Sequence, residues 1–132
     1  MPRTVLIVED EIFVALDLER ILTDAGYAVA AIAPDSETAL AAAPGCDFAL
    51  VDVNLRDGPT GPLIAERLAR DFGVKVVFVT ANPAQIGEVA GALGYVRKPF
   101  SESAIMAAAR LAETGELASD AVVPFNRSDK SA

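Results

Sequence analysis

The stretch FALVD at residues 48–52 joins four consecutive apolar residues to a single carboxylate, Asp52. Three further short apolar runs occur at Val5–Val8, Ala28–Ala33 and Val76–Val79. A strand with one wet face alternates apolar and polar residues, whereas a strand buried on both faces is apolar throughout. The four runs therefore predict strands of a parallel sheet that are buried on both faces.

Segments with helical periodicity separate these runs. The first ends at Gly26, where a helix C-cap favours glycine. Its apolar face consists of Val14, Leu18, Ile21, Leu22 and Ala25. A second, short helix is expected from an N-cap at Asp35 or Ser36 to just before Pro44, and a third from Pro62 to about Phe72. Each would connect two strands as a crossover helix.

The chain after Val79 predicts weaker structure. Pro83 and three nearby glycines leave room for only one poor helix, at about Ala84–Leu93. A fifth strand is expected at Tyr95–Arg97. We expect the segment between these two strands to be the most mobile part of the domain.

A last helix is predicted between Ser101, which can act as its N-cap, and Gly115. Its apolar face consists of Ile105, Ala108, Ala109 and Ala112. The order strand-helix thus repeats five times, which right-handed crossovers turn into a doubly wound α/β sheet with helices on both faces. The expected architecture is flavodoxin-like, with five parallel strands in the order 2-1-3-4-5.

The expected domain organisation is one domain at residues 1–116 and a short C-terminal tail at 117–132. The tail is too short for a DNA-binding module, so we expect no effector domain. Within residues 118–132 the only sizeable apolar side chains are those of Val122, Val123 and Phe125, which are candidates for docking on the domain or on a partner.

Composition excludes several kinds of function. The net charge of -8, from 19 acidic and 11 basic residues, would repel nucleic acids and anionic membranes. No secretory or membrane-spanning segment is visible, so a cytoplasmic location is expected. The chain has no histidine and one cysteine, Cys46, which argues against zinc sites of the usual kind and against internal disulfides. We interpret Cys46 as a small filler before a strand.

Polar residues follow four of the five predicted strands. In chain order these are Glu9-Asp10-Glu11, Asp52, Thr80 and Lys98-Pro99. Each has an ordinary explanation: the acidic run could complement a helix N-terminus, Asp52 could be a turn residue, Thr80 a cap and Lys98 a solvated charge. Their joint placement favours a site, because ligands bind at the carboxyl ends of the strands in such sheets.

The residue types indicate the chemistry of this site. Clustered carboxylates attract a cation, and Mg²⁺ prefers oxygen ligands. We expect Asp10 and Asp52 to bind the metal directly, Glu9 to hold a metal-bound water, and Asn54 to contribute its backbone carbonyl. Asp52 would also be the nucleophile that accepts a phosphoryl group. Lys98 and Thr80 would bind the remaining phosphoryl oxygens.

With these residues identified, residues 3–115 resemble a receiver domain of a two-component response regulator. The matching motifs are Glu9-Asp10 in VLIVEDE, Asp52 and Asn54 in ALVDVNL, Thr80 in VFVTA and Lys98 in VRKPF. The resemblance implies a cis bond between Lys98 and Pro99. It also implies that Tyr95 is an aromatic switch, which moves inward as the Thr80 hydroxyl turns toward the phosphate.

Two departures from the family pattern concern segments near the site. The loop Leu55–Gly61 is about one residue longer than usual. Only 17 residues separate Thr80 from Lys98, a few fewer than in the chemotaxis type. A shortened or partly unwound fourth helix would change the usual output and dimerisation face.

The expected function is that of a stand-alone phosphorelay switch. A histidine kinase or a histidine phosphotransfer protein would phosphorylate Asp52, and the altered surface would bind an unidentified downstream protein or form a homodimer. Apart from its own phosphorylation and dephosphorylation the protein is expected not to be an enzyme. One alternative is a Mg²⁺-dependent phosphohydrolase, although Asn54 stands where its second acid would be needed. The other is a receiver-like binding module that never carries phosphate.

Overall fold

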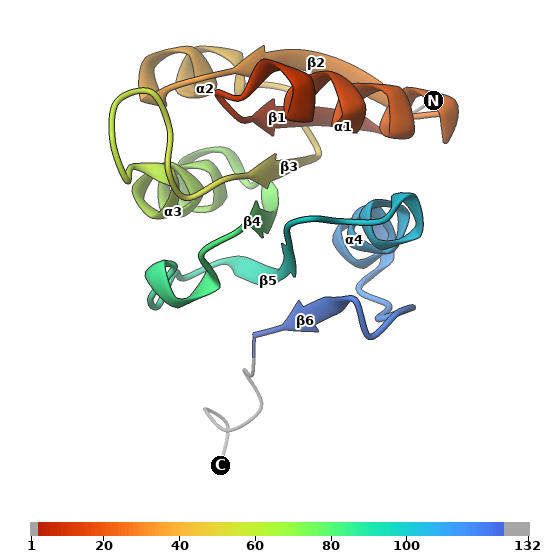
Figure 1. Ribbon diagram of the computed structural model, residues 1–132. Helices are drawn as coiled ribbons and strands as arrows, with labels where there is room; N and C mark the ends of the chain where they lie inside the picture. The colour runs from red at the N-terminus through yellow and green to blue at the C-terminus, as the bar shows by residue number, and fades with distance from the viewer. Residues whose placement is uncertain (1–2, 126–132) are drawn as a thin grey trace.

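The computed structural model describes residues 3–125 of the 132-residue chain. Strands and helices alternate along it (Figure 1). The elements are β1 (Thr4–Val8), α1 (Ile12–Asp24), β2 (Ala28–Ala33), α2 (Ser36–Ala42), β3 (Phe48–Val51), α3 (Gly61–Phe72), β4 (Lys75–Thr80), the 3₁₀ turn η1 (Pro83–Gln85), β5 (Ala92–Arg97), α4 (Glu102–Thr114) and β6 (Val122–Pro124).

The sheet has the order β2-β1-β3-β4-β5-β6. The first five strands in this order are parallel, which confirms the predicted α/β fold and the order 2-1-3-4-5. In Figure 1 the strands follow one another from β2 at the top to β6 at the bottom, with α2 and α3 on the left and α1 and α4 on the right. Helices thus cover both faces of the sheet.

The sixth strand was not predicted. β6 pairs antiparallel with β5 and makes Val122 one of the buried core residues, at 1% exposure. A strand of 3 residues is too short to show a periodic pattern, so its position depends on what it packs against. Part of the predicted tail 117–132 therefore belongs to the sheet. Residues 1–2 and 126–132, which include the two ends of the predicted domain and tail, lie outside the described range.

The predicted helix at Ala84–Leu93 does not form, and that prediction is wrong. Only η1 is helical in this part of the chain, and β5 begins at Ala92 rather than at Tyr95. Gly87 and Gly91 have φ angles of +70° and +91°, in the left-handed region, which ends any right-handed helix. The last helix is therefore α4.

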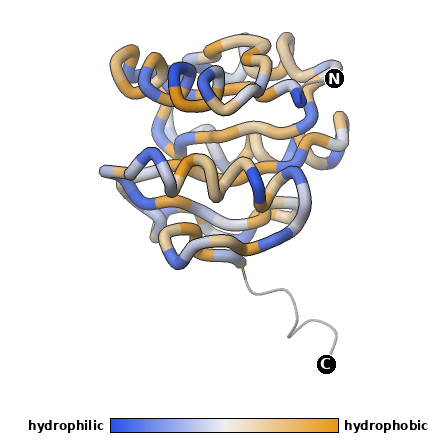
Figure 2. The backbone as a smooth tube through the Cα atoms, turned by 90° about the vertical axis from the view of Figure 1, so that its right-hand side faces the viewer, coloured by the Kyte–Doolittle hydropathy of each residue, from blue (hydrophilic) through white to orange (hydrophobic). Residues whose placement is uncertain are grey.

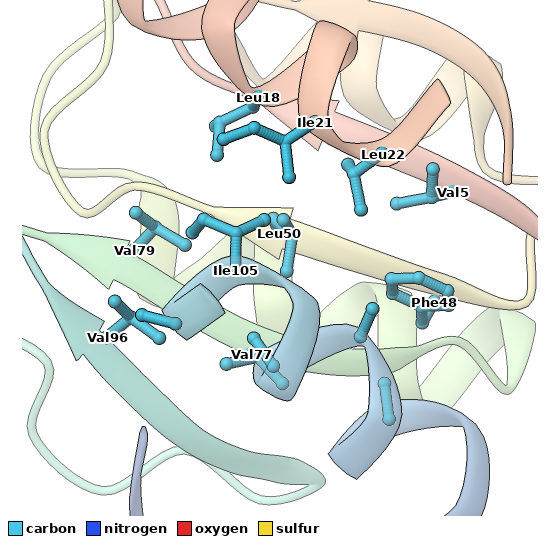
Figure 3. Close-up of a cluster of buried hydrophobic side chains, with 14 of the residues drawn as sticks. Val5, Leu18, Ile21, Leu22, Phe48, Leu50, Val77, Val79, Val96 and Ile105 are labelled. Atoms are coloured by element: carbon cyan, nitrogen blue, oxygen red, sulfur yellow. The ribbon is translucent and has the colours of Figure 1, made fainter. Parts of the chain in front are cut away.

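Two apolar cores lie on opposite faces of the sheet. Alternate residues of the strands serve each core, so that Val5 and Ile7 of β1 face α1 and α4, and Leu6 and Val8 face α2 and α3. Figure 3 shows side chains of the first core, from α1, α4 and four of the strands. Because each inner strand is buried on both sides, its sequence is continuously apolar.

The helices show the local signals that the sequence predicts. In Figure 2, where the side with α1 and α4 faces the viewer, hydrophobic and hydrophilic residues alternate along the helices, as expected for helices with one buried face. Asp35 caps α2 by accepting a hydrogen bond from the Thr38 N–H at 3.0 Å, and Ser101 caps α4 through the Ala104 N–H at 3.1 Å. Cys46 is a buried free thiol just before β3, as expected. Within residues 3–125 no helix is long and apolar enough to cross a membrane.

Candidate functional site

The carboxyl ends of β1, β3, β4 and β5 bring the predicted polar residues to one edge of the sheet. The Asp52 N–H donates to the Val8 carbonyl at 2.9 Å, which places Asp52 beside Glu9. The Lys98 N–H donates to the Thr80 carbonyl at 3.0 Å, which joins the ends of β4 and β5. The parallel register therefore assembles residues that are far apart in the sequence.

The Lys98 ammonium joins the two buried carboxylates of this site. Lys98 Nζ lies 2.8 Å from Glu9 Oε1 and 2.8 Å from Asp52 Oδ2. Glu9 is 2% exposed and Asp52 8% exposed. Because these groups are removed from water, their charges interact more strongly than surface ion pairs do.

Burial and charge shift the ionisation of two of these groups. Burial raises the pKa of Glu9 above its usual value, and the nearby charge of Asp52 adds to this, while the hydrogen bond from Lys98 acts in the opposite direction. Burial alone would lower the pKa of Lys98, but its hydrogen bonds to Asp52 and Glu9 outweigh burial and raise it. Lys98 therefore stays positively charged beside the acids.

Each oxygen of the Asp52 carboxylate has a hydrogen-bond partner. Oδ1 accepts from the Val53 N–H at 2.7 Å, and Oδ2 accepts from Lys98. A cavity of about 320 Å³ opens beside this carboxylate. Its walls are Asp10, Glu11, Asp52, Asn54, Leu55, Ala81, Asn82 and Lys98. The cavity gives a small anionic group access to Asp52.

Glu11 lies in the site although the sequence did not single it out as a ligand. Carboxylate oxygens of Glu9, Glu11 and Asp52 lie within 4.8 Å of one another, and Glu11 Oε1 is 3.5 Å from Lys98 Nζ. Asp10, which is a predicted direct ligand together with Asp52, lines the cavity outside this group of three. Asp10 and Glu11 are both exposed. Glu11 occupies the N-cap position of α1 without a capping side-chain hydrogen bond. Helix capping by Glu11 therefore does not explain the acidic run.

Of the remaining predicted residues, Asn54 lines the cavity, whereas Thr80 directly precedes the lining residues Ala81 and Asn82 in the sequence and is not itself part of the wall. Thr80 is fully buried at the end of β4, and its Oγ1 accepts a hydrogen bond from the Asn82 N–H at 3.0 Å. Asn54 is exposed, and its side-chain amide donates to Gln85 Oε1 at 2.9 Å, which connects the loop after β3 with η1. Gln85 was missed because only the fold places it near Asn54.

The loop after β3 is held at several points. Leu55 and Gly58 pair in an isolated antiparallel bridge, and Arg56 Nη2 lies 2.7 Å from Asp35 Oδ2 at the start of α2. Gly61 begins α3 against this loop, and a Cβ at this position would overlap the carbonyl oxygen of Asp52. The longer loop thus has a defined conformation that requires glycine beside the candidate nucleophile.

The donor atoms fit a hard divalent cation. Carboxylates and the side-chain amides of Asn54 and Asn82 line the cavity together with the Lys98 ammonium, and Mg²⁺ binds carboxylate and amide oxygens in preference to nitrogen or sulfur. Glu9, Asp10 and Asp52, with the Asn54 carbonyl, remain the predicted ligands, and Glu11 is a further carboxylate within reach.

Tyr95 lies on β5, and the peptide bond after Lys98 follows the end of that strand. The Lys98–Pro99 bond is cis, the geometry that the family resemblance implies. Tyr95 is half-buried and pairs in register with Phe78 of β4. Its ring contacts the ring of Phe125, with 6.0 Å between centroids. The predicted switch residue therefore touches the C-terminal segment.

The sequence matches a known family over residues 5–110, the response regulator receiver domain. It is 34% identical to the transcriptional regulatory protein PdtaR of Mycobacterium tuberculosis over 117 residues, which cover 85% of this chain and 57% of PdtaR. It is 31% identical to the chemotaxis protein CheY of Treponema pallidum over 115 residues, covering 80% of this chain and 78% of that protein. The chain thus spans little more than half the length of PdtaR.

Solved structures show the same fold. The solution structure of the PhyR response regulator REC domain of Erythrobacter litoralis superposes with a TM-score of 0.78 at 28% identity, covering 92% of this chain and 97% of that one. A signal receiver domain of a modulated diguanylate cyclase from Desulfovibrio desulfuricans, described as an example of alternate folding, gives a TM-score of 0.76 at 29% identity and covers 85% of this chain and 94% of its own.

Proposed function

Because this chain belongs to the response regulator receiver domain family, we propose that it is a phosphoacceptor switch whose phosphoryl group is carried by Asp52. One observation carries the proposal. Asp52 presents its carboxylate to a cavity of about 320 Å³ while Lys98 Nζ and the carboxylates of Glu9 and Glu11 lie around it. A nucleophile, a fixed cation and oxygen donors for a metal are thus combined at one strand end.

The proposed reaction is a phosphoryl transfer between two proteins. A carboxylate oxygen of Asp52 attacks the phosphorus of a phosphohistidine, the P–N bond breaks with its electron pair going to the imidazole, and a P–O bond forms the acyl phosphate. Lys98, which now lies 2.8 Å from Asp52, would bind a phosphoryl oxygen. A Mg²⁺ ion held by the acidic residues would neutralise charge on the transferred group.

The signal is proposed to leave the site through Thr80 and Tyr95. The Thr80 hydroxyl accepts a hydrogen bond from Asn82 now, and donating its own proton to a phosphoryl oxygen would draw it and the following segment toward Asp52. Space released beside Thr80 would allow Tyr95 to turn inward. The output is thus a change of surface shape that alters the binding of a downstream protein.

An exposed apolar patch supports a protein as the phosphodonor. Ile12, Phe13 and Leu16 at the start of α1 are 56%, 84% and 46% exposed, directly after the acidic residues of the site. Exposed apolar groups beside an active centre favour docking of another protein. The donor would be a histidine kinase or a histidine phosphotransfer protein, and the exchange would take place in the cytoplasm.

Two other functions fit the site less well. A phosphohydrolase needs a second acid to activate water close to Asp52, and the position two residues on is Asn54, whose side chain is bonded to Gln85. A binding module that never carries phosphate would not need Glu9, Asp52 and Lys98 to be buried together. We therefore propose no turnover of other substrates and no direct nucleic-acid binding, in keeping with the net charge of -8.

The test is to incubate the full chain with Mg²⁺ and acetyl phosphate and to measure its intact mass. We expect one phosphoryl adduct that is lost on treatment with hydroxylamine, which cleaves acyl phosphates. Asp52→Asn should prevent it. Asp24→Asn, at a position whose side chain is 70% exposed on α1, is the matched control and should keep the adduct.

Two kinds of result would contradict the proposed function. Absence of an adduct from the unaltered protein, or an adduct that persists in Asp52→Asn, would contradict the assignment of Asp52. Sustained release of phosphate from ordinary phosphate esters would favour the phosphohydrolase instead.

A further inference from the structure

The C-terminal strand β6 straddles the edge of the sheet. Val122 enters the core between the sheet and α4, and Phe125 packs against the core on the opposite face, with Tyr95 and Phe78. Side chains an odd number of residues apart on an extended chain point to opposite faces. One short segment is therefore anchored on both faces of the sheet at once.

Phe125 lies on the two strands that end at the phosphoacceptor site. Its ring centroid is 6.0 Å from that of Tyr95 on β5 and 6.5 Å from that of Phe78 on β4. Phe78 is two residues before Thr80, and Tyr95 is three residues before Lys98. If the end of β4 or β5 moved toward a phosphoryl group, the ring of Phe78 or Tyr95 would thus move as well, and each of these rings contacts Phe125.

The segment takes up surface that a helix after β4 would otherwise cover. Between β4 and β5 only η1 is helical, and this part of the chain contributes Ile86 and Val89 to the apolar core on that face. Phe125 packs beside them against the same core. Phe125 therefore helps to cover β4 and β5 on this face, through its contacts with Phe78 and Tyr95.

The backbone of β5 is shaped to admit β6. A Cβ on Gly94 would lie 2.5 Å from the Val123 carbonyl oxygen and 3.0 Å from Pro124 Cα. The φ of Gly94 is not in the left-handed region, so conformation alone does not require glycine there. Glycine is required there because β6 approaches the backbone of β5 so closely.

The attachment is short. β6 pairs through Val122, Val123 and Pro124, and the Phe125 N–H adds a hydrogen bond to the Leu93 carbonyl at 3.0 Å. Pro124 lies between two residues that pair with β5, at a position where a backbone N–H would point away from the sheet. A proline there prevents a further strand from pairing at this point. A strand held by so few bonds can detach without unfolding the domain.

We propose that residues 117–125 form a strap that closes the β5 edge in the unphosphorylated protein and is released when Asp52 is phosphorylated. The inference rests on the proposed function of Asp52 and adds the structural change that phosphorylation of Asp52 would cause. Turning inward toward Thr80 would take the Tyr95 ring out of its contact with Phe125. Release exposes the edge of β5 and the apolar surface of Phe78 and Tyr95 to a partner that supplies an extended strand in place of β6.

The test is amide hydrogen exchange of the full chain by NMR, with the phosphorylated fraction of each sample measured by intact mass. In the phosphorylated form the Phe125 amide should exchange about tenfold faster or more, a size typical of coupling between two sites. Amides within α4, such as that of Ala108, should not change. Because linkage is reciprocal, loosening the strap should also raise the phosphorylated fraction at a fixed acetyl phosphate concentration.

Two variants test the strap without altering the site. Gly94→Ala should speed exchange at Phe125 in the unphosphorylated protein, because its Cβ displaces β6. Phe125→Ala should speed exchange across β6 and raise the phosphorylated fraction, whereas Val123→Ala, at a side chain 40% exposed on the same strand, should raise it much less.

The outcomes separate this inference from the proposed function. An adduct on Asp52 with unchanged exchange at Phe125 would overturn the strap and leave the phosphoacceptor role standing. An equal phosphorylated fraction in Phe125→Ala and the unaltered chain would also overturn it. Failure to form an adduct at all would overturn both proposals.

Discussion

On one face of the sheet α1 and α4, each 13 residues long, pack side by side, whereas the other face has α2 of 7 residues, α3 of 12 and then the irregular segment after β4. The first two helices are also joined by an ion pair between Arg20 and Glu102 at 3.0 Å. The second face is completed by η1 and by Phe125 from the C-terminal segment.

The difference between the faces indicates where a signal can be reported. The site lies at the strand ends, which both faces share, but a change is transmitted most easily where the covering elements are short and weakly held. The segment after Thr80 and the strand β6 meet this condition, and both lie beside Tyr95. The face with α1 and α4 is then the rigid support.

The largest expected effect is on the rigid face. Ile105 of α4 is fully buried, and Ile105→Ala should lower the free energy of unfolding by about 3–5 kcal/mol, because two helices and the sheet prevent the cavity from closing. Urea unfolding of both proteins measures this. Met106→Ala, at the next residue and 48% exposed, should change stability by no more than about 0.5 kcal/mol. A similar loss in both variants would show that α4 is not rigidly packed.

A smaller loss is expected for the same substitution on the irregular segment. Ile86 is 4% exposed, yet it follows η1 in a part of the chain without a helix, so the surroundings can relax. Ile86→Ala should cost about 1–2 kcal/mol in urea unfolding. Ile64→Ala on α3 is the matched control on the same face, with an expected cost of about 2–5 kcal/mol. Equal losses at Ile86 and Ile105 would remove the proposed difference between the faces.

The smallest effect is expected for the carboxylate of Asp35, which connects the start of α2 with Arg56 of the loop after β3. Hydrogen bonds from Thr38 and from Arg56 lower the pKa of Asp35 to about 2. A carboxyl whose pKa is lower in the folded state stabilises the protein above its ordinary value of 3.8, and this contribution is lost as the pH falls toward 2. The urea midpoint should therefore fall between pH 5 and pH 3, and fall less in Asp35→Asn. Glu37→Gln, in the first turn of the same helix, should follow the unaltered protein. An unchanged pH response in Asp35→Asn would contradict the role of this group.

Much of the site could be predicted because its residues follow buried strands. Glu9, Asp52, Thr80 and Lys98 each come at the end of an apolar run, and parallel pairing of such runs brings their ends together. A doubly wound sheet has few alternatives for that pairing, so the strand order could be predicted as well. Local pattern and general topology were sufficient here.

The parts that could not be predicted depend on contacts between distant segments. Glu11 belongs to an acidic run in which only the fold shows which carboxylates lie near Asp52. Gln85 matters because the loop after β3 reaches it, and the helix expected at Ala84–Leu93 is absent because Gly87 and Gly91 adopt left-handed conformations. The pattern of residues along the chain cannot show these contacts and conformations, since each depends on which distant residues the fold brings nearby.

The sequence by itself thus determined the α/β order, the two-sided burial of β1, β3 and β4 and the residues that accompany Asp52, because apolar runs and their end residues are local properties. It did not determine the burial of β2, which lies at the edge of the sheet and is partly exposed. Only the tertiary structure decided that Val122 and Phe125 close the edge of β5. Three residues of strand have no stability of their own, and Gly94, Phe78 and Tyr95 are what hold them. The nucleophile could be found from its neighbours in sequence, whereas the segment proposed to report its state needed the fold.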